Sequence, residues 1–187
     1  MAIEDKHSRK RLEILKAVSD ALFDVEYHQL TVEDVASRAG VGKSTIYRWW
    51  KHKADLVLDA FKQHTLSIFD LDQKLNLEDN LVSQLLRLSY ALDHHLGRAL
   101  LVVLANHREM AAAFFIQYLL PRRQQMHHLI QQSIQSGEIC ADYEFDLMLD
   151  SLYGPIHYQI IFFNKMPDED YILKLVQMVL IPVRIQR

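Results

Sequence analysis

The sequence predicts an all-α protein, and three observations lead to that fold class. The chain has only five glycines and four prolines among its 187 residues, whereas these two residues together make up roughly 12% of an average soluble protein. It contains no Asn-Gly or Asp-Gly pair to close a tight hairpin. Its apolar residues recur at three- and four-residue steps, which is the spacing of one helix face. A β-sandwich or barrel, which needs turn residues every ~8 to 12 positions, is therefore not expected.

The composition also excludes several classes of protein. Half of the residues are apolar and 24% are charged, which is ordinary for a globular chain and not for a disordered or fibrous one. The single cysteine, Cys140, can form no intramolecular disulfide. The longest apolar stretch, residues 99–105, is far shorter than the ~20 residues that span a bilayer, and residues 1–16 lack the apolar segment of a signal peptide. We therefore expect a cytoplasmic protein that does not enter a membrane.

The N-terminal part is expected to begin with two helices. The first covers residues 8–25, and its apolar side chains fall on one face. These side chains are Leu12, Leu15, Val18, Leu22 and Val25. The second helix begins after Thr31, because Thr31 and Asp34 have the spacing of a capping box.

Two glycines mark the end of the second helix and the start of the third. Gly40 is expected to end the second helix, because glycine adopts a left-handed conformation at no steric cost. Gly42 then lets the chain enter a third helix at once, over residues 43–50. A fourth helix is expected over residues 53–68.

The rest of the chain is expected to form five or six longer helices after a polar stretch at residues 70–80. Pro121 suits the first turn of one helix, which should end at Gly137. Two more helices are predicted over residues 143–164 and 168–183. Because both are apolar around most of their circumference, one core-facing side cannot bury them, and they predict an interface with a second copy of the chain.

Residues 31–50 are predicted to form a helix-turn-helix, whose second helix presents side chains to the major groove of DNA. At ~100° per residue, Ile46 and Trp50 should point inward. The side chains left outside are Ser44, Thr45, Arg48 and Trp49, with Lys43 and Tyr47 at the margin. Although the net charge is −3, residues 38–53 contain five cations and no acid. Cations interleaved with aromatic and hydroxyl side chains suit contacts with bases and phosphates.

Residues 31–56, TVEDVASRAGVGKSTIYRWWKHKADL, resemble the DNA-binding signature of the tetracycline-repressor-like (TetR) family. The resemblance combines the Ala-Gly-Val turn, the Thr-Ile-Tyr core of the third helix, and Lys53 with Leu56 at fixed spacing. The family usually has phenylalanine where this chain has Trp50. The resemblance implies that eight residues lie at the DNA interface, namely Thr31, Lys43, Ser44, Thr45, Tyr47, Arg48, Trp49 and Lys53.

The same resemblance implies two domains and a regulatory role. Residues 8–68 would form the DNA-binding domain, and residues 69–187 a helical domain that dimerises and binds an effector. The expected function is a homodimeric transcriptional regulator, a repressor that binds a roughly palindromic operator in double-stranded DNA and is released by a small apolar effector. Ordinary core packing is the simpler explanation for each residue that could line the effector pocket, and these are Tyr90, His107, Phe115, Tyr118 and His157.

Other functions receive little support from the sequence. Residues 42–44 match the end of a nucleotide-binding P-loop, but Ser37 stands where its first glycine should be, and a helix is expected where a strand should precede it. Adjacent histidines at 94–95 and 127–128 diverge by ~100° on a helix and make poor metal ligands. We expect no catalytic residue, metal or cofactor. The alternative that stays open is a helical dimer that binds small molecules or proteins without binding an operator.

Overall fold

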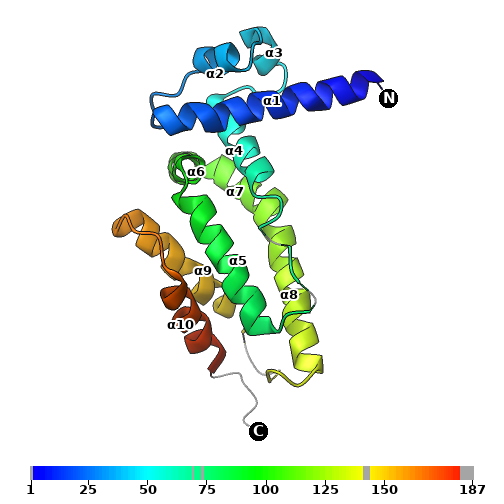
Figure 1. The fold of residues 1–187 in the computed structure, drawn as a ribbon, viewed down its shortest axis with the longest axis vertical. Helices are drawn as coiled ribbons and strands as arrows, with labels where there is room; N and C mark the ends of the chain where they lie inside the picture. Colours follow the sequence, from blue (N-terminus) through cyan, green and yellow to red (C-terminus); the bar gives the residue numbers. More distant parts are fainter. Residues whose placement is uncertain (1, 69, 73, 141–143, 182–187) are drawn as a thin grey trace. The chain divides into compact units, whose positions relative to one another are not determined.

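Figure 1 shows the computed structural model, which describes the chain apart from residues 1, 69, 73, 141–143 and 182–187, with side chains from Ser8 onward. The described residues form ten α-helices, one π-helical segment and no β-strand, so the all-α prediction is confirmed. They divide into two compact units. The first unit contains the residues up to Leu66 together with His94–Phe114, and the second contains Ser67–Asp93 and the residues from Phe115 onward.

The first unit contains six of the described helices. They are α1 (Ala2–Asp24), α2 (Val32–Arg38), α3 (Lys43–Tyr47), α4 (Lys53–His64), α6 (His95–Asn106) and α7 (Arg108–Phe114). Helix α1 packs against α2, α4 and α6, while α2 also packs against α3 (Figure 1). The fully buried apolar side chains at the centre include Ile14, Val18, Val35, Ile46, Val57 and Leu96. Because complete burial of one such side chain stabilises a fold by roughly 1.5–3 kcal/mol, these contacts hold the short helices α2 and α3 in place.

The second unit contains the other described helices, α5 (Leu77–Asp93), the π-helix η1 (Phe115–Leu119), α8 (Leu120–Gln135), α9 (Phe145–Phe162) and α10 (Glu169–Leu180). Helix α5 packs against α8, α9 and α10. Its buried Gln84 meets Tyr153 of α9, whose hydroxyl lies 2.9 Å from Nε2 and 3.0 Å from Oε1 of Gln84. Burial raises the pKa of Tyr153 to about 12. The pair therefore satisfies its own polar groups inside the unit.

The predicted helix boundaries that depend on local chemistry are confirmed. The Thr31 hydroxyl accepts a hydrogen bond from the Asp34 amide at 3.1 Å and caps α2. Gly40 has φ +61° at the end of α2, and Gly137 has φ +72° after α8. Pro121 stands in the first turn of α8. Each of these residues acts through its nearest neighbours, which explains why the sequence was sufficient to predict its role.

Other boundaries differ from the prediction. Helix α1 begins before residue 8, and α4 ends at His64 instead of continuing to residue 68. At that end the Phe61 carbonyl accepts hydrogen bonds from both the amide and the hydroxyl of Thr65, at 3.0 and 2.7 Å. Tyr143 and residues 182–183, where two helices were predicted to begin and end, lie outside the described residues.

The predicted domain boundary near residue 68 does not coincide with the packing. Helices α6 and α7 follow that boundary in the chain, yet they belong to the first compact unit. The assignment of residues 8–68 to DNA binding and of residues 69–187 to dimerisation and effector binding therefore stays a prediction. Among the described residues no single helix has the length and apolar character to cross a membrane, although the bent pair His95–Asn106 and Arg108–Gln135 passes by length and composition alone.

Three histidines of the first unit lie close together where α6 begins. The His94 ring accepts a hydrogen bond through Nδ1 from the Leu96 amide at 3.3 Å and so caps α6. It stacks on His64, with ring centroids 5.0 Å apart, and meets His95 edge-on at 5.7 Å. On its other side His95 contacts the uncharged ring of Phe23 from α1. Burial lowers the pKa of His94, and charge on His64 and His95 lowers it further.

We expect the fold to lose stability as the pH falls below about 6.5, the pKa of an unfolded histidine. Because the pKa of His94 is lower in the folded protein, the unfolded chain takes up the proton first. The stabilisation is thus complete above the unfolded value and is lost as the pH falls toward the folded one. His94→Asn keeps a capping acceptor that does not titrate, so its Tm should fall less between about pH 7.5 and about pH 5.5. Equal losses of Tm in both proteins would contradict this role.

Candidate nucleic-acid interface

Helices α2 and α3 are joined by a tight turn. Gly40 takes up the left-handed φ of +61°, and the Val41 amide then donates to the Ala36 carbonyl at 2.9 Å. Gly42 returns to extended backbone, with φ −76° and ψ 148°, and stands at the N-cap of α3. The two glycines therefore reverse the chain within a few residues, and the predicted helix-turn-helix is confirmed.

One side of the α3 segment belongs to the core. Ile46 and Trp50 are buried, with 0% and 3% of their surface exposed, as predicted. The helix itself ends at Tyr47, so its predicted extent to Trp50 is wrong. Beyond it, the amides of Trp49 and Trp50 both donate to the Ile46 carbonyl, at 2.9 and 3.0 Å. The last turn thus tightens, yet it still directs Trp50 inward.

The opposite side of the segment faces solvent. Ser44, Tyr47 and Arg48 are exposed, whereas Thr45 and Trp49 are half-buried. Tyr47, expected at the margin, has 51% of its surface exposed. The guanidinium of Arg48 lies 5.7 Å from the centroid of the Trp49 ring. A tyrosine and an arginine beside each other on one exposed face are suited to phosphates and base edges.

Two further predicted contact residues are already engaged by the protein. Lys43 forms an ion pair with Glu33 of α2, with Nζ and Oε1 2.8 Å apart. The hydrogen bond and the charge of this pair lower the pKa of Glu33 and raise that of Lys43. Thr31 is exposed, but its hydroxyl caps α2. Thr31 stands at the start of α2 and Lys43 at the start of α3, and DNA would have to draw Lys43 away from Glu33.

Lys53 differs most from its predicted role. Its ammonium donates to the backbone carbonyls of Tyr27, His28 and Leu30, at 3.0, 3.2 and 3.1 Å. It also lies 4.7 Å from the centroid of the Tyr27 ring. All three ammonium hydrogens are therefore directed at the loop between α1 and α2. The predicted phosphate contact would require Lys53 to release one of these carbonyls.

We expect Lys53→Met to lower the free energy of unfolding by about 2 kcal/mol, because hydrogen bonds to a charged group stabilise more than neutral ones. Methionine keeps most of the aliphatic stem, so the loss would report the carbonyl contacts. Urea unfolding measures the effect, and Lys51→Met at an exposed neighbour is the matched control. If Lys53→Met unfolds as wild type does and instead lowers the salt dependence of DNA binding by about one ion per subunit, the phosphate contact is correct.

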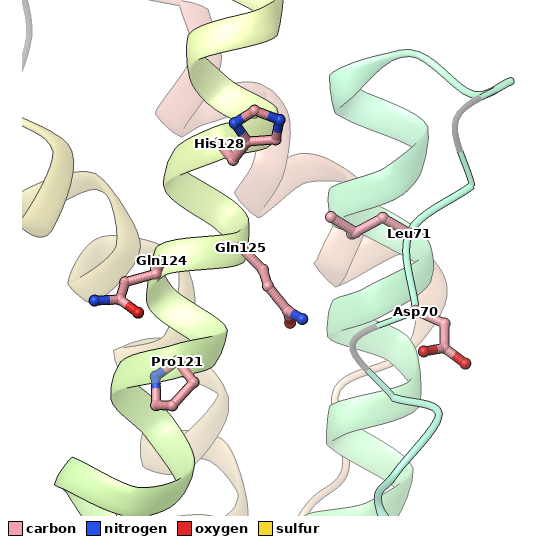
Figure 2. A pocket seen from close by; sticks show the side chains of 6 residues that line it. All are labelled: Asp70, Leu71, Pro121, Gln124, Gln125 and His128. Atoms are coloured by element: carbon pink, nitrogen blue, oxygen red, sulfur yellow. The ribbon is translucent and has the colours of Figure 1, made fainter.

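Two adjoining cavities lie in the second unit. One, of about 690 Å³, lies between α8 and the chain that precedes α5, and Figure 2 shows its lining. An adjoining cavity of about 530 Å³ shares Leu71, Gln125 and His128 with it. Most side chains around the first cavity are polar, namely Asp70, Gln124, Gln125 and His128. Within the described part of the chain, no group of three or more histidine, cysteine or acidic side chains is placed to hold a metal ion.

The five residues considered for an effector pocket differ in burial and are divided between the two compact units. Tyr90 and Phe115 have 63% and 44% of their surfaces exposed, and Tyr118 is buried. His157 is half-buried in α9, and the exposed His107 belongs to the first compact unit. None of the five is among the described residues that line the two cavities. Their grouping as an effector site stays a prediction, because helical periodicity does not show which helices become neighbours.

Helices α9 and α10 expose several large apolar side chains, and we call this set the α9/α10 apolar face. Its large side chains are Leu147, Tyr158, Ile161 and Phe162 on α9 and Leu173 and Met178 on α10. In the middle of α9, Gly154 is also exposed, and a Cβ added there would meet no atom within 4 Å. Exposed apolar side chains in such number on two neighbouring helices make this face a candidate for interaction.

The chain is similar to known regulators along nearly its whole length. Residues 14–60 match the family described as "Bacterial regulatory proteins, tetR family", and residues 75–179 match "Tetracyclin repressor-like, C-terminal domain". The uncharacterized HTH-type transcriptional regulator Rv1556 of Mycobacterium tuberculosis is 30% identical over 94% of this chain and 88% of its own length. YdeS of Bacillus subtilis, another such regulator, is 26% identical over 93% and 92%. The crystal structure of the TetR family transcription regulator SCO0332 superposes with a TM-score of 0.73, at 24% identity over 91% and 96%.

Proposed function

Because the chain belongs to the TetR family of helix-turn-helix transcriptional regulators, we propose that it represses transcription by binding a roughly palindromic operator as a homodimer. The observation that carries this proposal is the two-sided α3 segment. Its inward side, Ile46 and Trp50, is anchored in the core, and its outward side presents Tyr47 and Arg48 to solvent. This is the arrangement that a major-groove recognition helix requires.

The proposed DNA interface consists of eight residues. Ser44, Tyr47 and Arg48 are exposed, and Thr45 and Trp49 are partly so. Thr31 and Lys43 lie at the edge, and Lys53 supports the loop between α1 and α2. We assign base reading to Arg48 and phosphate contacts to the hydroxyl side chains and Lys43, because guanidinium groups match guanine O6 and N7.

The proposed homodimer uses the α9/α10 apolar face on each subunit. A two-fold interface pairs the same surface on both copies. Burying the large exposed apolar side chains of this face against a second copy would remove them from water. Two-fold symmetry would also supply two recognition helices, which must lie about one DNA turn, ~34 Å, apart to reach successive major grooves.

The proposed regulator responds to a small-molecule effector. An effector that binds better to a conformation with wrongly spaced recognition helices weakens operator binding through a coupling of typically ~1 to 3 kcal/mol. The cavities beside α8 are candidate effector sites, and their polar side chains favour a more polar ligand than the sequence predicted. A saturating effector that left the operator affinity unchanged would contradict this mechanism.

We also propose that the protein acts in the cytoplasm and is not an enzyme. Recognition of DNA requires binding contacts and no catalytic residue. Selecting bound fragments from genomic DNA would yield the operator and its half-site spacing. Affinity should then fall about 10³- to 10⁵-fold between about 50 and 200 mM salt if ~6 to 10 phosphates are contacted. Affinity that is independent of salt and sequence would favour a helical dimer that binds small molecules or proteins without an operator.

A further inference from the structure

Three side chains from separate parts of the first unit meet at one carboxylate. The indole Nε1 of Trp50 donates to Oδ2 of Asp59 at 2.9 Å, and Nη2 of Arg11 donates to the same oxygen at 2.6 Å. The Arg11 guanidinium also lies 5.7 Å from the centroid of the Trp50 ring. Lys62 lies 3.5 Å from the other oxygen, Oδ1. Asp59, on α4, thereby connects α1 to the segment that follows α3.

The Asp59 carboxylate is held in its charged form. Burial alone would raise its pKa, but the hydrogen bonds from Trp50 and Arg11, together with the charges of Lys62 and Arg11, outweigh burial and lower it. The side chain is 24% exposed, so solvent screens these contacts only in part. Both hydrogen bonds are therefore charge-assisted, and such bonds are shorter and more directional than neutral ones.

The contacts continue from Trp50 to the exposed side of the segment. The rings of Trp50 and Trp49 meet edge-on, with centroids 5.5 Å apart and planes at 76°. Trp49 in turn carries the guanidinium of Arg48 over its ring. A rotation of the Trp50 indole would thus move Trp49, and Trp49 would move Arg48.

We infer that Trp50, Asp59 and Arg11 are positioning residues, which set the direction of Arg48 and so the operator selectivity without touching DNA. This inference rests on the proposed function, because it assigns the control of base reading within that interface. Base contacts need a fixed side-chain direction, whereas contacts with phosphates supply non-specific affinity and tolerate more freedom. Loosening the network therefore lowers specific binding more than non-specific binding.

Trp50→Phe and Asp59→Asn test the inference. Phenylalanine keeps a buried aromatic ring but lacks the indole N–H that donates to Asp59 and the five-membered ring that carries it. We expect each variant to lose about tenfold of its preference for the selected operator over non-operator DNA of the same length, which corresponds to about 1.4 kcal/mol. The double variant should lose less than the sum of the two single variants, because Trp50 and Asp59 act through a shared contact.

A matched substitution serves as the control for the negative charge that Asp59→Asn removes. Asp59→Asn removes a negative charge, which by itself strengthens binding to any DNA. Glu13→Gln makes the same change on α1, where Glu13 pairs with Arg9 and Lys10. We expect Glu13→Gln to retain the full preference for operator over non-operator DNA. If the network variants lose operator and non-operator affinity equally, or lose neither, the positioning role is wrong.

A measurement without DNA separates this inference from the proposed function. Trp49 and Trp50 are the only tryptophans in the chain, and at 5.5 Å their indole transitions couple. Asp59→Asn should therefore change the near-ultraviolet circular dichroism of the pair, while Glu13→Gln should not. An unchanged spectrum in Asp59→Asn would overturn the network even if operator binding is found. Absence of any DNA preference in the wild-type protein would instead refute the proposed function.

Discussion

Replacing Arg48 with alanine is expected to weaken operator binding by about 1 to 3 kcal/mol at each half-site, and therefore by roughly twice that for the homodimer. Arg48 is exposed, so the substitution creates no cavity, and the free energy of unfolding should be unchanged. Its guanidinium, over the Trp49 ring, is the group we assign to base reading. Binding titrations against the selected operator and against variants with single base changes measure the effect.

The selectivity of Arg48→Ala carries as much information as its affinity. If Arg48 reads a base, the preference at one base pair of each half-site should relax while the others persist. Arg108→Ala, at an exposed arginine of α7, is the control for a lost positive charge. A uniform loss for all sequences would make Arg48 a phosphate contact, and binding equal to wild type would remove it from the interface.

Tyr158→Glu is expected to convert the proposed homodimer into monomers and to abolish the proposed tight operator binding. Tyr158 has 54% of its surface exposed on the α9/α10 apolar face, where it contacts the rings of Phe162 and Phe163. A carboxylate is solvated there in the monomer, whereas in the interface it would be buried without a partner, which costs about 3 kcal/mol or more per copy. Analytical ultracentrifugation measures the oligomeric state, and far-ultraviolet circular dichroism shows whether each protomer stays folded.

The control for Tyr158→Glu introduces the same charge elsewhere. Gln131 is exposed on α8 of the same unit, and Gln131→Glu should leave the oligomeric state and operator affinity as in the wild type. Should Tyr158→Glu remain a dimer with full operator affinity, the subunits meet through another surface.

The parts of the fold that the sequence predicted correctly depend on neighbours close in the chain. The Thr31 cap bonds to an amide three residues away, and the positive φ of Gly40 reflects its own lack of a side chain. The burial of Ile46 and Trp50 followed from helical phase across a single turn. The same local rules failed at the end of α3, because the energy difference between a continued α-helical turn and a tightened turn is small.

The predictions about Lys53 and Trp50 were incomplete for a different reason. Lys53 bonds to carbonyls 23 to 26 residues away, and the Trp50 partner Arg11 belongs to α1. No spacing rule links such distant positions, since they meet only after α1 and α4 have packed. An indole N–H at a buried position requires an acceptor, which was the one signal in the sequence that Trp50 had a polar partner. The residues that line an effector pocket are harder still to predict, because they depend on which faces of several helices converge.

The ion pair between Lys43 and Glu33 means that the protein carries one of its own counterions at the candidate interface. Binding to DNA yields entropy when mobile ions return to bulk solution, but a tethered carboxylate cannot be released. A phosphate that captures Lys43 therefore replaces one fixed anion with another. It also leaves Glu33 uncompensated next to a polyanion. The dependence of affinity on ionic strength should thus correspond to fewer released ions than the number of lysines and arginines near the turn. Glu33 should also repel DNA phosphates that approach without pairing with Lys43.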